Sequence, residues 1–305
     1  MRNGLTHENL GTNNLISISP NIKSLKEVFI CFDFSCNLNC PHCTLQSIKL
    51  KKDIKAIRKT IDFIKEFNPD ITFNFFGGEP LLLPDNEIKM FEDLFYSNPI
   101  IVSTNLLRLT DYQLNLFKNV EDVNTSWNPR RFSDNQLHSW LLNLNKLKER
   151  FIPFSIMVTL TDDLVSNYKP EEFLDLIEYF EPRNLDLKFM VGDYNMDFNK
   201  VDEWLVELYK YYQLNCYSFS CLLFKEMEDV VKGIKIWKQY CPTVATIYPN
   251  GNLKLGCPYY EYKTDKSACL ACEYYPVCQG GCDIQEKCAF PKKLYEVIKC
   301  QNCLT

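Results

Sequence analysis

The chain has 305 residues, a formal net charge of −5 and a pI near 5.4, with 46% hydrophobic and 24% charged residues. This composition is typical of a globular protein, with length for one large α/β domain plus an appendage or for two domains. An acidic chain without a basic stripe excludes nucleic acid as an expected partner. Residues 1–25 are polar, and no apolar run reaches the ~18 residues of a membrane span. We therefore expect a cytoplasmic protein without a membrane partner.

Short apolar runs alternate with longer amphipathic runs after residue 27. The short runs are rich in β-branched and aromatic residues, which predicts strands at 28–34, 71–76, 100–104, 120–127, 153–159 and 185–191. The amphipathic runs predict helices at 54–67, 86–96, 111–118, 134–150, 170–180 and 200–212. Such alternation implies a parallel sheet with right-handed crossovers, and six units are fewer than the eight of a closed barrel. We therefore expect an α/β fold with a partial (β/α)6 TIM-like barrel.

Three cysteines follow the first predicted strand at C-x3-C-x2-C spacing: Cys36, Cys40 and Cys43. A [4Fe–4S] cluster normally takes four thiolates, so a loop with three can hold a cluster whose fourth iron is open to a substrate or cofactor. Structural zinc is the alternative, because C-x2-C is a common zinc half-site. Zinc needs a fourth ligand, and His42 cannot reach the ion bound by its neighbour Cys43 without strain. The spacing therefore favours iron–sulfur over zinc.

Fifteen cysteines in a chain without a signal peptide indicate metal binding rather than disulfides, because the cytoplasm is reducing. Nine of them lie between Cys241 and Cys303. Three others lie in apolar or aromatic surroundings that predict buried structural thiols: Cys31, Cys216 and Cys221. We expect a polar N-terminal extension, the barrel, a linker helix and a small Cys-rich iron–sulfur domain, at residues 1–26, 27–215, 216–240 and 241–305.

A Gly-Gly-Glu-Pro turn, residues 77–80, follows the second predicted strand. Two glycines allow a tight turn with close backbone approach to a ligand, and the Glu-Pro pair fixes a carboxylate beside it. Taken alone, the motif also fits an ordinary strand-to-helix turn. Together with the three-cysteine loop it closely resembles the radical S-adenosylmethionine (radical SAM) superfamily.

This resemblance implies a [4Fe–4S] cluster on Cys36, Cys40 and Cys43, with the methionyl amine and carboxylate of S-adenosylmethionine on the open iron. It further implies cofactor contacts from the aromatic position of the cysteine loop, the glycine turn and several strand ends, at His42, Gly77, Gly78, Glu79, Ser103, Asn105, Thr159 and Val191. For the Ser/Thr/Asn strand ends, ordinary caps and turns are the alternative. The pair Arg130-Arg131 can bind a substrate or methionyl carboxylate bidentately, or form a solvated surface pair.

The C-terminal cysteines resemble the SPASM extension of radical SAM enzymes, because the run C-x2-C-x5-C-x3-C matches without a change. A zinc knuckle is the alternative. The resemblance implies two auxiliary [4Fe–4S] clusters, one on Cys269, Cys272, Cys278 and Cys300 and the other on Cys241, Cys257 and Cys282. The interval 242–256 contains no further cysteine. The second cluster therefore has an open iron, or Cys216, Cys221, Cys288 or Cys303 closes it; Cys288 and Cys303 are otherwise spare thiols.

The chemistry implied is reductive cleavage of S-adenosylmethionine to a 5′-deoxyadenosyl radical that abstracts hydrogen from a C–H bond. We expect an oxidoreductase that oxidises or cross-links a side chain of a peptide or protein, as a RiPP-type maturase. A dehydrogenase of a small alcohol or amino sugar and a non-catalytic iron–sulfur electron-transfer or scaffold protein are the alternatives. A low-potential cluster calls for an external flavodoxin- or ferredoxin-type donor.

Relatives that oxidise sulfatases carry Asp after the cysteine that matches Cys257, whereas Pro258 stands here, which disfavours that activity. Three polar residues are candidates for proton handling, with exposed loop polarity as the alternative: Tyr260, Glu261 and Asp283. The first predicted strand begins near residue 27, so no N-terminal leader-binding module fits. Leader recognition is therefore expected from a separate protein or from the barrel, unless the substrate is small.

Overall fold

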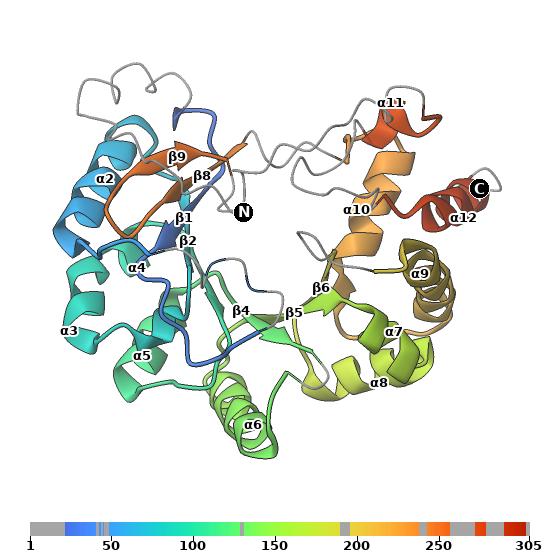
Figure 1. Cartoon of the computed structure of the whole chain (residues 1–305), viewed down its shortest axis with the longest axis horizontal. Coiled ribbons are helices and arrows are strands. Elements are labelled where there is room, and N and C mark those ends of the chain that lie inside the picture. Colours follow the sequence, from blue (N-terminus) through green and yellow to red (C-terminus); the bar gives the residue numbers. More distant parts are fainter. Residues whose placement is uncertain are drawn as a thin grey trace, which may run out of the picture.

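The computed structural model describes residues 22–40, 43, 45, 49–128, 131–189, 196–237, 243–256, 272–278 and 290–302. Within these residues, six parallel strands follow one another in sheet order and in sequence order. They are β1 (Glu27–Cys31), β2 (Thr72–Phe76), β3 (Ile100–Thr104), β4 (Asp122–Trp127), β5 (Phe154–Leu160) and β6 (Asn184–Phe189). The strands form an open arc with helices on its outer side (Figure 1), which confirms the predicted partial barrel.

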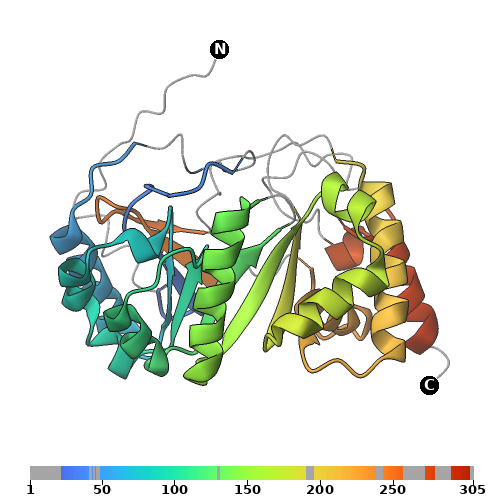
Figure 2. The same cartoon turned by 90° about the horizontal axis from the view of Figure 1, so that it is seen from below.

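The helices between these strands largely follow the apolar spacing of the sequence. Viewed from below, α6 crosses the outside of the central strands (Figure 2). The connecting helices are α2 (Ile54–Phe67), α5 (Asp111–Leu116) with η6 (Phe117–Asn119), α6 (Asp134–Glu149), α7 (Asp162–Asn167), α8 (Pro170–Phe180) and α9 (Phe198–Leu214). The predictions for 54–67 and 170–180 are confirmed at both ends.

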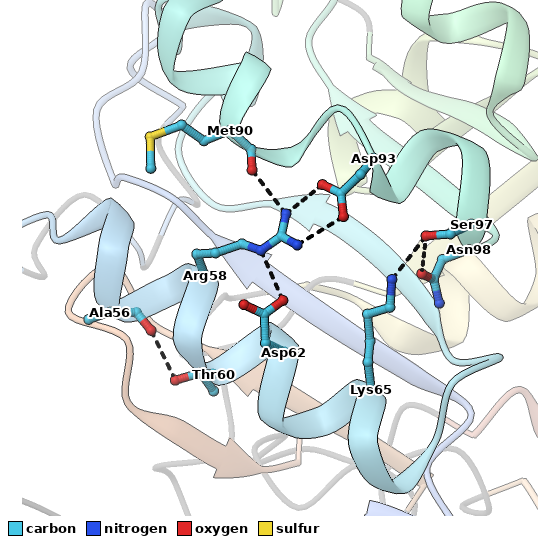
Figure 3. A network of polar contacts seen from close by, with 9 residues as sticks. All are labelled: Ala56, Arg58, Thr60, Asp62, Lys65, Met90, Asp93, Ser97 and Asn98. Atoms are coloured by element: carbon cyan, nitrogen blue, oxygen red, sulfur yellow. Dashed lines mark hydrogen bonds and ion pairs between the residues drawn. The ribbon is translucent and has the colours of Figure 1, made fainter.

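The continuous helix predicted for 86–96 is wrong. After η4 (Pro80–Leu82), the segment instead forms α3 (Asp85–Ile88), η5 (Lys89–Phe91) and α4 (Leu94–Ser97). Arg58 of α2 donates to the Met90 carbonyl at 3.0 Å, holds Asp93 through two N–H groups and binds Asp62 at 2.9 Å (Figure 3). A continuous α-helix would use the Met90 carbonyl for the N–H of residue 94. Arg58 bonds this carbonyl at the point where the helix is interrupted.

The C-terminal part adds strands that the sequence analysis did not predict. They are β7 (Ser220–Cys221) beside β6, β8 (Val244–Ile247) parallel to β1, and β9 (Leu253–Leu255) antiparallel to β8. Gly251 in the β8–β9 turn lies against α2, because an added Cβ would come within 2.6 Å of the Ala56 side chain. Thr60 of α2 donates to the Gly251 carbonyl at 2.7 Å. The segment after the barrel is thus fixed to its first strand and first helix.

Three further helices cover the other end of the sheet: α10 (Leu222–Val231), α11 (Tyr275–Cys278) and α12 (Lys292–Asn302). Asp202 of α9 accepts the backbone N–H groups of Lys293 and Leu294 at 2.8 and 3.1 Å, which satisfies donors in the first turn of α12. None of the described helices is both long and apolar enough to cross a membrane.

The two faces of the barrel sheet differ in polarity. On the outer face, apolar side chains pack under the helices. The polar Thr125 on this face has a hydrogen-bond partner, since its hydroxyl accepts the indole N–H of Trp140 at 2.9 Å. On the concave face, Asn74 donates to Glu27 at 2.7 Å and accepts from Ser103 at 2.9 Å. A polar concave face is unusual for a parallel sheet, which is normally apolar on both faces. The interior of the arc is therefore suited to a polar ligand.

Candidate active site

The ends of β1, β2 and β3 meet at one edge of the sheet, where ligands bind in parallel α/β architectures. The N–H groups of Gly78 and Glu79 donate to the carbonyls of Asp33 and Ser35 at 2.9 and 2.8 Å. These bonds explain why β1 ends at Cys31 rather than at the predicted residue 34: the segment leading to Cys36 bonds the glycine turn instead. The cysteine loop and the glycine turn form one unit.

Both glycines are required by this contact. Gly77 has φ +129°, and an added Cβ would lie 2.7 Å from the Asp33 carbonyl oxygen. A Cβ on Gly78 would lie 2.0 Å from the carbonyl oxygen of Ser35. The glycines were expected to allow backbone approach to a ligand; in the structure they allow close approach of the turn to the cysteine loop.

Glu79 is buried, with 4% exposure, and its carboxylate accepts three hydrogen bonds from neutral donors. Its Oε1 accepts from the Thr104 hydroxyl at 2.6 Å and from the Leu81 N–H at 3.0 Å, and its Oε2 accepts from the Asn105 N–H at 2.7 Å. Burial raises the pKa of Glu79, and the hydrogen bonds oppose this shift. A carboxylate has about four acceptor positions, so one remains for a cationic ligand.

Cys36 is half-buried and its sulfur accepts two N–H groups, from Leu38 at 3.4 Å and from the Asn105 side chain at 3.7 Å. Burial raises the pKa of Cys36; nearby Glu79 and Cys40 raise it further, while the Leu38 N–H and Arg131 lower it. Donors on a sulfur are the surroundings that a ligating thiolate needs. By residue type, three thiols on one short loop are the donors that an iron–sulfur cluster takes. Among the described residues, no three His, Cys, Asp or Glu side chains are grouped so as to hold a metal ion.

Arg131 brings a positive charge toward this site. It acts electrostatically on both Cys36 and Glu79. Its Nε is buried and has no hydrogen-bond partner within the described part of the chain, and its guanidinium lies 5.7 Å from the Phe132 ring centroid. An unpaired buried donor costs about 1–3 kcal/mol, so an anion at this point would stabilise it. The sequence pointed to the pair Arg130-Arg131, of which Arg130 lies outside the described residues.

Other predicted site residues are partly accounted for. Ser103 donates to Asn74 on the concave face, and Thr159 of β5 accepts the Asn128 side chain through its carbonyl at 2.9 Å. Cys31 and Cys221 are buried as predicted, but the prediction for Cys216 is wrong, because it is exposed in the segment after α9. Outside the described residues lie His42, Arg130, Val191, Cys241, Cys257, Cys269, Cys282, Cys288, Cys303, Tyr260, Glu261 and Asp283.

The other predicted cluster cysteines that the structure describes lie in two short helical segments. Cys278 is buried at the end of α11, Cys272 is half-buried just before α11, and Cys300 is exposed on α12. Asn37 and Thr104 were not among the predicted site residues, although both are partners of the central residues. Thr104 was detectable, because it ends the strand beside β2 and precedes Asn105.

A scan against protein-family models and a search of curated proteins gave no match. Solved structures, however, share the fold. Native anSMEcpe with bound AdoMet and the Cp18Cys peptide matches with a TM-score of 0.71 at 14% identity, over 91% of this chain and 97% of that chain. Streptococcus suis SuiB bound to S-adenosylmethionine matches with a TM-score of 0.60 at 15% identity, over 85% and 73% of the two chains. SuiB bound to the precursor peptide SuiA gives 0.59 at 14% identity, over 92% and 80%. The chain therefore has the fold of these AdoMet- and peptide-binding proteins.

Proposed function

We propose that this chain is a radical SAM enzyme that modifies a side chain of a peptide or protein. The observation that carries the proposal is the junction of the three-cysteine loop with the buried carboxylate of Glu79 at the strand ends. Electron transfer alone does not need such a carboxylate beside an open ligand loop. The shared fold with anSMEcpe and SuiB, which were solved with AdoMet and with peptides, supports the same assignment.

Some of the site residues would bind the iron–sulfur cluster, and others would bind S-adenosylmethionine. Cys36, Cys40 and Cys43 would hold a [4Fe–4S] cluster, and Glu79 would accept the methionyl ammonium of S-adenosylmethionine. The unpaired Nε–H of Arg131 would donate to the methionyl carboxylate. When bound, the cluster and S-adenosylmethionine supply a 5′-deoxyadenosyl radical that abstracts hydrogen. The protein orients the cofactor and excludes water.

The peptide substrate would lie along the polar concave face. Hydrogen-bonding side chains such as Asn74 and Ser103 line this face, and they suit a ligand with amide groups. We assign the auxiliary clusters to Cys269, Cys272, Cys278 and Cys300 and to Cys241, Cys257 and Cys282, on the sequence resemblance. An electron donor of the flavodoxin or ferredoxin type and a separate leader-binding protein are the proposed partners, and Tyr260, Glu261 and Asp283 the proposed proton carriers.

Cofactor chemistry is tested with protein reconstituted anaerobically with iron and sulfide. Reductant and S-adenosylmethionine should give 5′-deoxyadenosine, and Cys36→Ala, Cys40→Ala and Cys43→Ala should abolish it. Cys216→Ala, which removes an exposed thiol that the proposed cluster assignment does not use, is the matched control and should keep the activity. Three clusters correspond to about twelve iron atoms per chain. Full activity of a loop variant, or bound zinc with little iron, would overturn the proposal.

The substrate class needs a second measurement. Product mass spectrometry with a peptide encoded beside the gene should show a loss of two hydrogens or a new cross-link. Release of 5′-deoxyadenosine with every peptide left unchanged, and with a small alcohol or amino sugar oxidised instead, would refute the peptide assignment and leave the cofactor chemistry intact.

A further inference from the structure

Asn105 connects the two halves of the site, and every polar group of its side chain is used. Its backbone N–H donates to Glu79 at 2.7 Å, and its side-chain Oδ1 accepts the N–H of Leu107 at 3.0 Å. Because a backbone N–H can only donate, the bond to Leu107 assigns the oxygen of the amide and turns Nδ2 toward the cysteine loop. There Nδ2 donates to Asn37 Oδ1 at 2.7 Å and lies 3.7 Å from Cys36 Sγ.

The backbone at Leu106, next to Asn105, is held in an unfavourable conformation in this arrangement. Leu106 is fully buried and has φ +56°, a left-handed conformation that costs a non-glycine residue strain energy. Two bonds keep it there: its N–H donates to the Thr104 hydroxyl at 2.9 Å, and its carbonyl accepts the Asn143 side chain at 2.9 Å. Strain that the surroundings hold in place is common where geometry serves a function. Here it directs the Asn105 amide to Cys36.

The contacts around Cys36 also indicate whether the Asn105 side chain stabilises the neutral thiol or the thiolate. Asn37 Oδ1 lies 4.0 Å from Cys36 Sγ, where it can accept only the S–H of a neutral thiol. Iron binding removes that proton, so this contact no longer stabilises the sulfur. The N–H of Asn105 and the backbone N–H of Leu38 are then the favourable partners of the thiolate.

We propose that Asn105 is a positioning residue that raises the reduction potential of the cluster on Cys36. An N–H donor withdraws charge from the sulfur and so stabilises the reduced cluster, and hydrogen bonds to the sulfurs are among the features that set iron–sulfur potentials. The inference rests on the proposed function, because it requires a cluster at Cys36. It assigns the side chain of Asn105 to the cluster, rather than to S-adenosylmethionine as the sequence predicted.

The test compares two variants of the reconstituted enzyme. Asn105→Ala removes the whole amide, and Asn105→Asp keeps the Oδ1 acceptor for Leu107 and the backbone N–H for Glu79 but removes the Nδ2 donor. Redox titration followed by electron paramagnetic resonance should show a negative shift of the midpoint potential in both, larger for Asp because it adds charge. The cluster is identified as the one whose signal changes when S-adenosylmethionine is added.

Asn128→Asp is the matched control, because it makes the same exchange at the end of β4, where the side chain bonds the Thr159 carbonyl. The midpoint potential of the cluster should shift less in Asn128→Asp than in Asn105→Asp. An equal shift would mean that the added negative charge alone causes the effect, and it would overturn the inference. If Asn105→Ala fails to assemble the cluster, the midpoint potential of Asn105→Asp decides the test. If the wild-type chain cleaves S-adenosylmethionine and both Asn105 variants have the wild-type midpoint potential, this inference is refuted and the proposed function is not. A wild-type chain that binds no iron–sulfur cluster refutes the proposed function and this inference with it.

Discussion

Two carboxylates of this molecule are held by several hydrogen bonds and yet have opposite properties. Glu79 is buried and bonded by a hydroxyl and two backbone N–H groups. Asp93 has a side chain 53% exposed and is bonded by both terminal nitrogens of Arg58. Burial raises the pKa of Glu79, whereas the Arg58 guanidinium lowers the pKa of Asp93. The charge of the hydrogen-bond partner and the exposure to solvent, not the number of hydrogen bonds, decide whether the pKa is raised or lowered.

This difference separates a binding site from a structural link. Asp93 is neutralised by Arg58 and fastens the segment after η5 to α2. Among the described residues, Glu79 is in contact with neutral donors, and the positive charge of Arg131 acts on it at longer range, so a cation can still be bound with a gain in free energy. Changes around Glu79 should therefore affect cofactor binding strongly, and changes around Asp93 should affect only stability.

The largest effect is expected from Gly78→Ala. The new Cβ would lie 2.0 Å from the Ser35 carbonyl oxygen, so the segment before Cys36 must move. We expect a loss of about 3 kcal/mol in the free energy of unfolding and failure to bind the cluster, since overpacking costs about 1–3 kcal/mol, occasionally more. Urea denaturation and iron content measure both. Gly233→Ala, where φ is +69° but no atom lies within 4 Å, should cost about 1 kcal/mol and keep its iron. Equal behaviour of the two variants would contradict the close contact.

The next effect is expected from Glu79→Gln, which keeps the size of the side chain and removes its charge. Losing one partner of a buried charged pair costs about 2 kcal/mol or more, which corresponds to roughly 30-fold weaker binding of S-adenosylmethionine. Calorimetric titration of reconstituted protein checks this. Glu87→Gln, at a half-buried pair with Lys52, is the matched control and should bind S-adenosylmethionine like the wild type. An unchanged affinity of Glu79→Gln would refute the role of Glu79.

The contrast between these regions also shows what the sequence could reveal. Cys36, Cys40, Cys43 and the glycine turn were detectable because each motif is contiguous and its chemistry depends on spacing. The six strands and most helices were detectable because apolar periodicity is a local signal. The break in helix 86–96 was not detectable in this way; at the break, Arg58 from another helix bonds the Met90 carbonyl.

Long-range partners explain the remaining differences. The strand β8 has only four residues, and its place in the sheet is fixed by pairing with β1, from the other end of the chain. The contact of Asn37 with Asn105 joins the loops after β1 and β3, so neither residue alone indicates it. Cys216 has aromatic neighbours in sequence, but its position after the end of α9 leaves it exposed.

The pH dependence of stability should have opposite signs in the two regions. The raised pKa of Glu79 gives stability that is complete below the ordinary value of 4.5 and is lost as pH rises through the folded-state pKa. The lowered pKa of Asp93 gives stability that is present above 3.8 and lost as pH falls through the folded-state pKa. The destabilisation by Glu79→Gln should therefore shrink as pH rises above 4.5, and that by Asp93→Asn should shrink as pH falls below 3.8. Chemical denaturation across this range measures both; slopes of the same sign would remove the distinction.

The smallest effect is expected from Arg58→Lys, which keeps the charge but loses the planar fork that binds Asp93, Asp62 and the Met90 carbonyl together. Because the side chains of Arg58 and Asp93 are 28% and 53% exposed, water and salt screen the pair, and we expect a loss of at most about 1 kcal/mol that decreases at high salt. Urea denaturation at low and high salt measures it, with Lys210→Ala, which breaks an exposed pair with Glu207, as a control near zero. Iron content should stay unchanged, since the network joins α2 to the segment around Met90 and Asp93 and includes none of the loop cysteines. A loss of iron in Arg58→Lys would mean that the link between α2 and the following helices also positions the cysteine loop, and the separation of structural and binding carboxylates would fail.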